Sequence, residues 1–382
     1  MFSKINARFA LLVLVAALCA SICHADTMAP RVFVAREGKG YLEKVGPQMV
    51  LHLKGTPEEM GCQYGVLLKN EINSMVKLLE QNSENKLGAL SGVGQSMLDT
   101  AWNQQQAYMP PRYTSELKAL ARSCGISYER LRRANTIPEL FHCSGFAIFG
   151  GATTDGKLYH GRILDYGLGL GFQDHSVVII AEPSGFNAYV NVSYAGFTGS
   201  VTGMNMNGMG FGEMGGGGVG KWDGLPMSFL MRRGLEEAKT LSQAKNIFSK
   251  SKRTCEYYYV ISDGNTPSAV GVSAKPEAIE FLDPNESRGP LHVAIKDAVV
   301  MSASDRYELL TKRITENWGK LDAAKCRELM RRPVSMQSCL HCVLMAPKTG
   351  EMWVAHASSK GEPASEQPYV YLNIKELMAK KP

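Results

Sequence analysis

The sequence contains a combination of side chains suited to nucleophilic catalysis, centred on Cys143. Cys143 opens the run 143–146, and the run 161–166 contains Arg162 and Asp165. A cysteine reacts as its thiolate, and a neighbouring guanidinium stabilises that thiolate. Cys143 with Arg162 is therefore a candidate for acyl-transfer chemistry, provided that the fold brings the two together.

Two short predicted strands would do so. The residues at 145–149 and 158–164 are typical of strands, and an Asp-Gly pair between them is typical of a hairpin turn. A hairpin places the end of its second strand beside the start of its first, so Arg162 and Asp165 would lie next to Cys143. On residue types alone, a lone Cys is more often a buried packing residue, and an Arg near an Asp is often a plain ion pair.

The pattern Cys-Ser-(x)n-Asp-Gly-x-Leu-x-x-Gly-Arg-x-x-Asp-Tyr, from Cys143 to Tyr166, resembles a known family. This is the acyl-CoA:6-aminopenicillanate acyltransferase-like family of N-terminal-nucleophile (Ntn) cysteine hydrolases, related to acid ceramidase and the choloylglycine hydrolases. The resemblance runs from about Gly55 to the C-terminus. It implies an α+β fold, a four-layer αββα sandwich of two antiparallel sheets with helices outside each. It also implies self-cleavage between His142 and Cys143.

The resemblance assigns a role to each residue of the motif. Cys143 would be the nucleophile, and its freed α-amine, with a pKa of roughly 7.7–8.0, would be the base. Asp165 would hold that amine, and Arg162 would stabilise the thiolate. The implied function is an exported cysteine amidohydrolase or acyltransferase that cleaves a non-peptide amide of a small N-acyl substrate through an acyl-enzyme, without a cofactor or metal ion.

One part of the family pattern is missing. Relatives carry an Asn in a "T-N-H" element that helps to bind the oxyanion, but residues 297–307 here contain no Asn. Ser302, Ser304 or backbone N–H groups could replace it, and Arg306 resembles a late family Arg near the site. Asn205 is a further candidate, although in its "G-M-N" run it is more typical of a turn. The missing Asn favours the alternative function, a non-catalytic or uncleaved Ntn-fold binding protein.

The ends and the order of predicted elements indicate three parts. Residues 1–25, with two basic residues before an apolar run, are typical of a secretory signal peptide that is too short to remain as a membrane anchor. We expect a secreted or periplasmic protein, or a lysosomal or other lumenal one in a eukaryote. Residues 26–142 form the predicted, mostly helical pro-segment, and residues 143–382 form the catalytic core.

The pro-segment begins with an extended lead-in and a first strand, and a helix should then start at Thr56, where Pro57 and Glu59 complete a capping pattern. Further helical stretches continue to Ala134. The core alternates strands with helices at 226–238, 242–248, 309–318 and 323–331, which indicates helices packed outside sheets. If the pro-segment packs its apolar side on this core, the small and large chains should stay associated after cleavage.

The remaining motifs favour plainer interpretations. A formal net charge of +6 over 382 residues, without a basic cluster, does not indicate a nucleic-acid partner. Cys339 and Cys342 are three apart in a predicted strand, so we expect them on opposite faces and not as metal ligands. The Gly-rich run 215–221 lacks the hydroxyl of a nucleotide-binding loop and is expected to be a loop near the substrate cleft. Four methionines could line an apolar acyl pocket or fill the core: Met204, Met206, Met209 and Met214.

Overall fold

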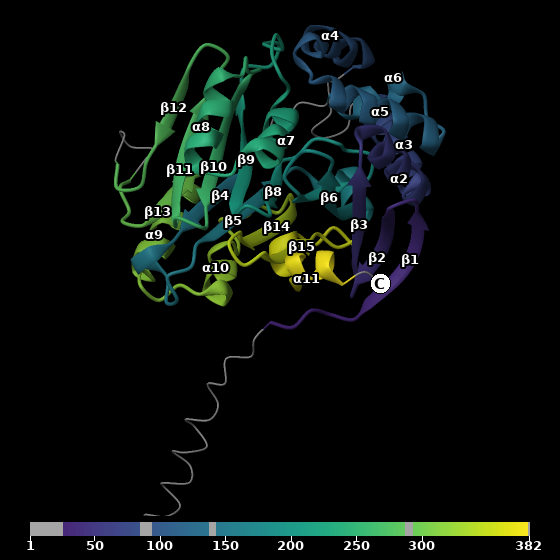
Figure 1. Ribbon diagram of the computed structural model, residues 1–382. Coiled ribbons are helices and arrows are strands. Elements are labelled where there is room, and N and C mark those ends of the chain that lie inside the picture. Colours follow the sequence, from purple (N-terminus) through teal and green to yellow (C-terminus); the bar gives the residue numbers. More distant parts are fainter. Residues whose placement is uncertain (1–25, 85–93, 137–142, 287–292, 381–382) are drawn as a thin grey trace, which may run out of the picture.

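The chain folds into two β-sheets that face each other, with helices on their outer surfaces (Figure 1). The computed structural model describes residues 26–84, 94–136, 143–286 and 293–380. Strands of the two sheets contact each other across the interior, as between β9 (Met209–Gly217) and β5 (Tyr159–Asp165). The predicted α+β, four-layer arrangement is confirmed.

The first sheet has ten strands and runs across both the N-terminal segment and the core. Neighbouring strands are antiparallel, except that β3 pairs with β6 in parallel. In spatial order the strands are β1 (Arg31–Glu37), β2 (Gly40–Val45), β3 (Gln48–Gly55), β6 (Ser176–Pro183), β7 (Tyr189–Tyr194), β8 (Thr202–Asn205), β9, β10 (Glu256–Asp263), β11 (Ser268–Ala274) and β12 (Ile279–Leu282).

The second sheet has six strands, all antiparallel to their neighbours. Its spatial order is β13 (Ala298–Met301), β4 (Ser144–Ile148), β5, β14 (Cys339–Ala346), β15 (Glu351–His356) and β16 (Val370–Asn373). The predicted hairpin of residues 145–149 and 158–164 is present as β4 and β5, displaced by one residue. Since β4 and β5 are flanked by β13 and β14, the candidate site lies within the sheet and not at its edge.

Glycines allow the two sheets to approach closely near this hairpin. A Cβ atom on Gly145 would lie 2.9 Å from Met214 Sδ of the opposite sheet. A Cβ atom on Gly212 would lie 2.9 Å from Cγ of Arg162. Real Cβ atoms do not approach that closely, so a side chain at either position would require the Met214 or Arg162 side chain to move.

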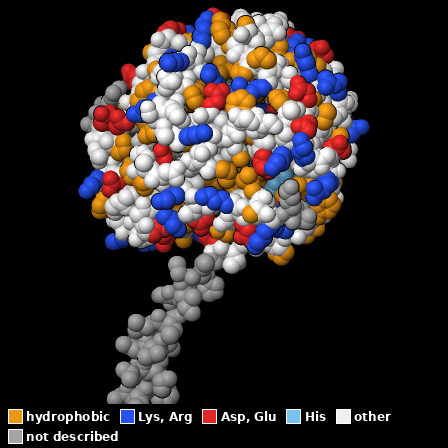
Figure 2. Space-filling view, viewed as in Figure 1, with side chains coloured by type: hydrophobic (Ala, Val, Ile, Leu, Met, Phe, Trp, Pro, Cys, Tyr) orange, Lys and Arg blue, Asp and Glu red, His pale blue; other side chains and the backbone are white. Residues whose placement is uncertain are grey.

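Helices cover both outer faces and complete the four layers. Helices α7 (Met227–Glu237) and α8 (Leu241–Lys250) pack on the ten-stranded sheet, where Phe248 stacks on Phe211 of β9. Helices α9 (Ser304–Glu316) and α10 (Ala323–Leu329) pack on the six-stranded sheet. The short helix α11 (Ile374–Ala379) ends the described chain. On the face drawn in Figure 2, acidic and basic side chains are interspersed over the surface.

The N-terminal segment differs in part from expectation. It contributes three strands to the ten-stranded sheet, and only from Pro57 onward is it mostly helical. Its helices are α2 (Pro57–Leu67), α3 (Lys69–Glu84), α4 (Gln95–Gln105), η3 (Gln106–Tyr108), α5 (Pro111–Cys124) and α6 (Tyr128–Ala134). The predicted capping box at Thr56 is confirmed, with Glu59 N–H donating to Thr56 and Thr56 N–H donating to Glu59. The mostly helical description therefore missed how strongly this segment joins the sheet.

Two local predictions were wrong. The run Gly203–Met209 was expected to be a turn, but residues 202–205 form strand β8 and only the following residues turn. Cys339 and Cys342 were expected on opposite faces, yet their Sγ atoms lie 3.5 Å apart. A register shift between Cys339 and His341 where β14 pairs with β5 breaks the strict alternation of side chains. Within the described residues, no helix is long and apolar enough to cross a membrane.

Candidate active site

Cys143 and Arg162 lie on the same side of the β4–β5 hairpin, the side that faces the ten-stranded sheet. Gly145 pairs with Arg162 and Ser144 with Ile163, so the next pair in register would be Cys143 with Leu164. Because side chains alternate along a strand, Cys143 and Arg162 project into the space between the sheets. Cys143 is 2% exposed and Arg162 is fully buried. The hairpin thus places the candidate thiol and guanidinium on the same face, two register positions apart.

Asp165, at the end of β5, lies on the opposite face of the sheet from Arg162 and pairs with Arg306 of α9. Arg306 Nη1 lies 2.5 Å from Asp165 Oδ2, and Met336 N–H donates to Asp165 Oδ1 at 2.9 Å. Burial raises the pKa of the Asp165 carboxyl, while the Met336 N–H and the Arg306 charge act against that shift. The candidate site therefore contains two arginines, one on each face of the strand.

Sequence reasoning missed Glu213, which is the carboxylate that accompanies Arg162. Arg162 Nη2 lies 3.3 Å from Glu213 Oε2, and both side chains are completely buried. Gly212 precedes Glu213 on β9 and has no side chain, so the Arg162 guanidinium can pass it to reach Glu213. A signal was available, since Glu213 is the lone charged residue in a strand of glycine and apolar residues.

The two candidate serines follow β13, one directly and one at the start of α9. Ser302 directly follows β13, whose Met301 pairs with Gly145, and its Oγ lies 2.6 Å from Ser144 Oγ. Ser304 is the first residue of α9 and has a φ of +53°, which is uncommon for a residue with a Cβ atom. Ser302 is thus placed next to the start of β4, whereas Ser304 belongs to α9.

Asn205 has a structural position instead. Its Nδ2 donates to the carbonyls of Leu235 and Ala238 at the end of α7, at 2.9 and 2.7 Å. Its Oδ1 accepts from the N–H groups of Asn207 and Met209 in the turn between β8 and β9. These four bonds use the hydrogen-bonding capacity of the amide, so Asn205 fixes the turn to α7 and is not brought to the Cys143 site.

Buried histidines lie beside Arg162 in the interior between the sheets. His160 Nδ1 is 2.8 Å from Ser262 Oγ, and His341 Nε2 is 3.0 Å from Thr202 Oγ1. Burial, followed by the Arg162 charge, lowers the pKa of His160 to about 3 and that of His341 well below its usual value. Burial lowers the pKa of His356 to about 4. These imidazoles are therefore neutral at pH 7 and cannot act as cationic partners of the thiolate.

Because these histidines are buried and neutral, we expect the free energy of unfolding to fall in mild acid. Their pKa values are lower in the folded than in the unfolded state, so the unfolded state binds more protons as the pH falls from about 6.5 to about 4. Each group should lower the free energy of unfolding by up to about 1.4 kcal/mol per pH unit in that window. Urea unfolding at about pH 7 and about pH 5 measures the effect.

The control for this prediction is His160→Gln, which keeps a partner for Ser262 but does not titrate. Its unfolding free energy should depend less on pH than that of the wild type. Burial raises the pKa values of the Asp165 and Glu116 carboxyls, which opposes the histidine trend, so the difference between variant and wild type isolates His160. Equal pH dependence of the two proteins would contradict the account.

An apolar cavity of about 90 Å³ lies against both sheets, and Cys143 is not among the residues that line it. Leu164, the register neighbour of Cys143, forms part of its wall together with Leu340 of the six-stranded sheet. The other walls come from Tyr194 and Tyr257 of the ten-stranded sheet, Met75 of the N-terminal segment, Met227 of α7 and residues between these elements, such as Trp222. None of the four methionines expected from the sequence lines this cavity. Met209 and Met214 belong to the apolar core and Met204 to a separate core cluster.

The Gly-rich run, Cys339 and the possible metal ligands also have defined positions in the structure. The Gly-rich run 215–221 was expected to be a loop, but residues 215–217 belong to β9 and only the remainder leads as a loop to Trp222, which lines the cavity. Burial, followed by the Cys342 thiol, raises the pKa of Cys339 well above its usual value, so this thiol is protonated. Among the described residues, no group of three or more His, Cys, Asp or Glu is arranged to hold a metal ion. His142 lies outside the described residues.

The model of the family described as acyl-coenzyme A:6-aminopenicillanic acid acyl-transferase matches residues 154–292. Protein dcd1B of Dictyostelium discoideum is 24% identical over 403 residues, covering 92% of this chain and 80% of that protein. Acid ceramidase of Rattus norvegicus is 28% identical over 205 residues, covering 46% of this chain and 50% of that protein.

Among solved structures, the Caenorhabditis elegans N-acylethanolamine-hydrolyzing acid amidase ortholog matches with a TM-score of 0.46 and 17% identity, covering 54% of this chain and 93% of that one. The family match begins between β4 and β5, after Cys143, and includes both Arg162 and Asp165. The resemblance to the acyl-coenzyme A:6-aminopenicillanic acid acyl-transferase family, inferred from the motif around these residues, is therefore confirmed over residues 154–292.

Proposed function

We propose that this protein is a cysteine amidohydrolase or acyltransferase of the N-terminal-nucleophile type, with Cys143 as the nucleophile. The observation that carries the proposal is the position of Cys143. It shares the inner face of the hairpin with Arg162, its register neighbour Leu164 lines the apolar cavity, and the Asp165–Arg306 pair lies at the end of β5. The family match and the acid ceramidase relative support chemistry on an amide-linked acyl group.

The reaction requires a base, which the chain supplies after cleavage before Cys143. The freed α-amine takes the thiol proton, and Sγ attacks the amide carbonyl carbon. The C–N bond then breaks, the leaving amine takes the proton from the ammonium, and a thioester joins the acyl group to Cys143. Water, or an acceptor amine in a transferase, attacks the thioester and restores the thiol.

The surrounding charges support these steps. Arg306 and Met336 N–H hold Asp165 at the end of β5, and in this proposal its carboxylate accepts a hydrogen bond from the freed Cys143 amine. Arg162 stabilises the thiolate, and Glu213 holds the guanidinium in place. For the oxyanion we propose Ser302 or backbone N–H groups at the start of α9, because the Asn of the family pattern is missing and β13 brings Ser302 next to Ser144.

We propose further that the chain is exported through its N-terminal signal and that the two cleavage products stay together. Parallel pairing of β3 with β6 joins the segment before Cys143 to the core by six residue pairs. Helices α2, α3 and α5 bury apolar side chains in the same core cluster as Cys143 and Leu164. Separation of the products would expose this surface to water, which opposes dissociation.

A panel of N-acyl amino acids, acyl-homoserine lactones, penicillins and ceramides tests the proposed function. We expect hydrolysis or transfer of at least one class by the wild type and none by Cys143→Ala. Cys62→Ser is the matched control, because Cys62 is an exposed thiol on α2 and its replacement should leave activity unchanged. Absence of Cys143-dependent turnover across the panel would favour the non-catalytic binding protein, which the missing Asn also favours.

Arg162→Lys should slow the reaction while it keeps a positive charge next to Glu213. Lysine cannot reproduce the two-pronged geometry of a guanidinium, and loss of one charge-assisted interaction costs about 1.5–3 kcal/mol, or roughly one to two decades in rate. The measurements are kcat/KM and the pH dependence of thiol alkylation, whose midpoint should rise. Unchanged values of both would remove Arg162 from the catalytic machinery.

A further inference from the structure

Two cysteine thiols lie in contact in β14, outside the residues that carry the proposed reaction. The Sγ atoms of Cys339 and Cys342 are 3.5 Å apart, and both side chains are fully buried. A disulfide bond is about 2.0 Å long, so its formation here would bring the two sulfur atoms closer by about 1.5 Å. Within the described residues, no group of three or more His, Cys, Asp or Glu is arranged to hold a metal ion. The contact is therefore suited to a disulfide.

An irregularity in the strand produces this contact. Where β14 pairs with β5, Cys339 lies opposite Asp165 and Cys342 lies opposite Ile163. Asp165 and Ile163 are two positions apart on β5, so their side chains point to the same face of the sheet. Leu340 is the extra residue of the register shift, which lets two cysteines that are three apart in sequence share that face. In a regular strand they would point to opposite faces, so the shift is what makes a bond between them possible.

The segment that contains Cys339 also holds Asp165 in place. Met336 N–H donates to Asp165 Oδ1 at 2.9 Å, and the Ser338 carbonyl accepts from Tyr166 N–H at 3.1 Å. Cys339 N–H donates to the Met336 carbonyl at 3.2 Å, which closes a short turn at the start of β14. The turn and Cys339 therefore flank the carboxylate, and the position of Cys339 affects how firmly Asp165 is held.

We propose that Cys339 and Cys342 form a disulfide bond in the exported protein, and that this bond fixes Cys339 and the turn 336–339 beside Asp165. The inference rests on the proposed function, which assigns export to the chain and gives Asp165 the task of holding the Cys143 amine. Disulfides persist in the oxidising compartments that exported proteins reach, and they are rare elsewhere. The bond makes Cys339 a positioning residue for the reaction, since it acts through Asp165 and not on the substrate.

Thiol–disulfide exchange forms the bond, with a small-molecule or protein disulfide as the oxidant. One thiolate of the pair attacks a sulfur atom of the oxidant and displaces a thiolate, which leaves a mixed disulfide. The second thiolate attacks the protein sulfur of this mixed disulfide, so that the Sγ–Sγ bond forms and the second oxidant thiol leaves. The pair loses two electrons and two protons in total, and the oxidant is reduced to two thiols. Because both thiols are buried in the folded chain, the exchange takes place during folding, before α10 covers this face of the sheet.

Peptide mass spectrometry tests the bond directly. The chain is expressed with residues 1–25, recovered from the exported fraction, denatured with N-ethylmaleimide in the absence of reductant, and digested with trypsin. The tryptic peptide 332–348 contains both cysteines and no other cysteine. It should be free of label and lighter than the dithiol by two hydrogen atoms, whereas Cys124, a buried cysteine on α5, should carry one label. Label on both Cys339 and Cys342 would overturn the proposal.

The effect on Asp165 is measured with variants that cannot form the bond. Cys342→Ala and the double variant Cys339→Ala with Cys342→Ala should each lower kcat by about tenfold, because a small displacement of a catalytic group is costly. The acidic midpoint of the pH–rate profile should shift to lower pH, since a carboxylate that is less well held stabilises the Cys143 ammonium less. Cys326→Ala removes a buried thiol from the same core cluster and should retain both values. Wild-type rates and pH profiles in the first two variants would overturn the link to Asp165.

The mass measurement also separates failure of this inference from failure of the proposed function, because it needs no turnover. An unlabelled, oxidised peptide in a protein that hydrolyses no amide would support the bond and overturn the enzyme. Cys143-dependent turnover by a protein whose peptide carries two labels would overturn the bond and leave the enzyme standing. If the chain is found only in a reducing compartment, it is refolded with oxidised and reduced glutathione. An oxidised peptide then supports the bond and overturns export, and a doubly labelled peptide overturns the bond.

Discussion

Cys143→Ala should yield a single uncut, folded and inactive chain, whereas the wild type should split before Cys143 into pieces of 117 and 240 residues after the signal is removed. While Cys143 is inside the chain, its nitrogen is an amide and cannot accept a proton, so the catalytic base does not yet exist. Attack of Cys143 Sγ on the preceding carbonyl gives a thioester, and hydrolysis of that thioester frees the amine. Intact-mass spectrometry and N-terminal sequencing measure both products.

Cleavage before Cys143 should not depend on other thiols of the chain. Cys62→Ser retains Cys143 and should be cut like the wild type, since its thiol lies on the exposed face of α2. A wild-type chain that remains whole while it hydrolyses amides would show that the N-terminal amine is not the base. In that case Cys143 could still be the nucleophile, but the role assigned to Asp165 would be wrong.

Glu213→Leu should strongly destabilise the protein. It removes the carboxylate next to the fully buried Arg162 guanidinium, and breaking a buried ion pair from one side costs about 3–5 kcal/mol. Urea unfolding at neutral pH measures this loss. The double variant Glu213→Leu with Arg162→Met should recover much of the stability, because it removes the buried guanidinium as well as the carboxylate.

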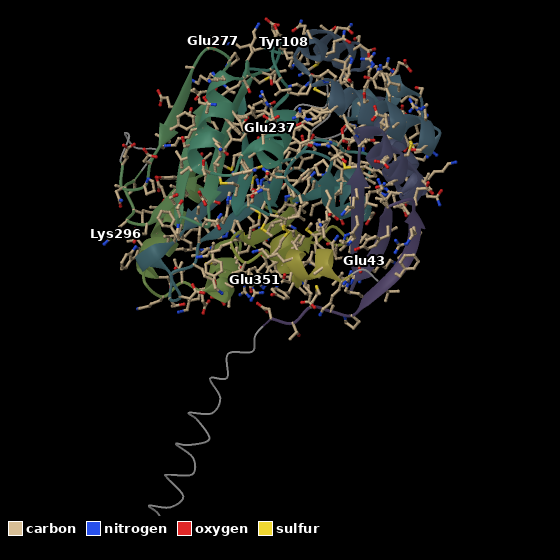
Figure 3. All side chains as sticks on the ribbon, in the orientation of Figure 1. Glu43, Tyr108, Glu237, Glu277, Lys296 and Glu351 are labelled. Carbon is tan, nitrogen blue, oxygen red and sulfur yellow. The ribbon has the colours of Figure 1, made fainter. Side chains whose placement is uncertain are left out.

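The matched control is Glu277→Leu, at the molecular surface. Glu277 pairs with Lys221, both side chains are more than half exposed, and Figure 3 shows Glu277 at the periphery. Solvent screens this pair, so its loss should hardly change the unfolding midpoint. If Glu213→Leu were as stable as Glu277→Leu, Glu213 would not be the counter-ion that the buried Arg162 requires.

Local patterns predicted the hairpin and the helix starts well. The strand signals at 145–149 and 158–164 and the capping residues at Thr56 depend on neighbours in the sequence, and the structure follows them closely. The same patterns placed Arg162 on the face of the hairpin that Cys143 shares. These features are set by side-chain alternation and by backbone groups within a few residues.

Contacts between distant segments could not be predicted in this way. Glu213 reaches Arg162 from another sheet, and Arg306 reaches Asp165 from a helix 141 positions later. The contact between Cys339 and Cys342 depends on a register shift that no alternation rule contains. The cavity wall combines α3, α4 and several strands, so its residues share no sequence pattern. Packing between elements decides each of these features.

The central claim is that Cys143 carries the acyl group, and trapping the intermediate tests it most directly. The protein is mixed with an N-acyl substrate that it turns over, quenched in acid within the first turnovers, and digested for mass spectrometry. The account predicts an increase equal to the acyl group on the peptide that begins with Cys143, and no such increase in Cys143→Ala. Sustained turnover without an adduct, retained by Cys143→Ala, would contradict it.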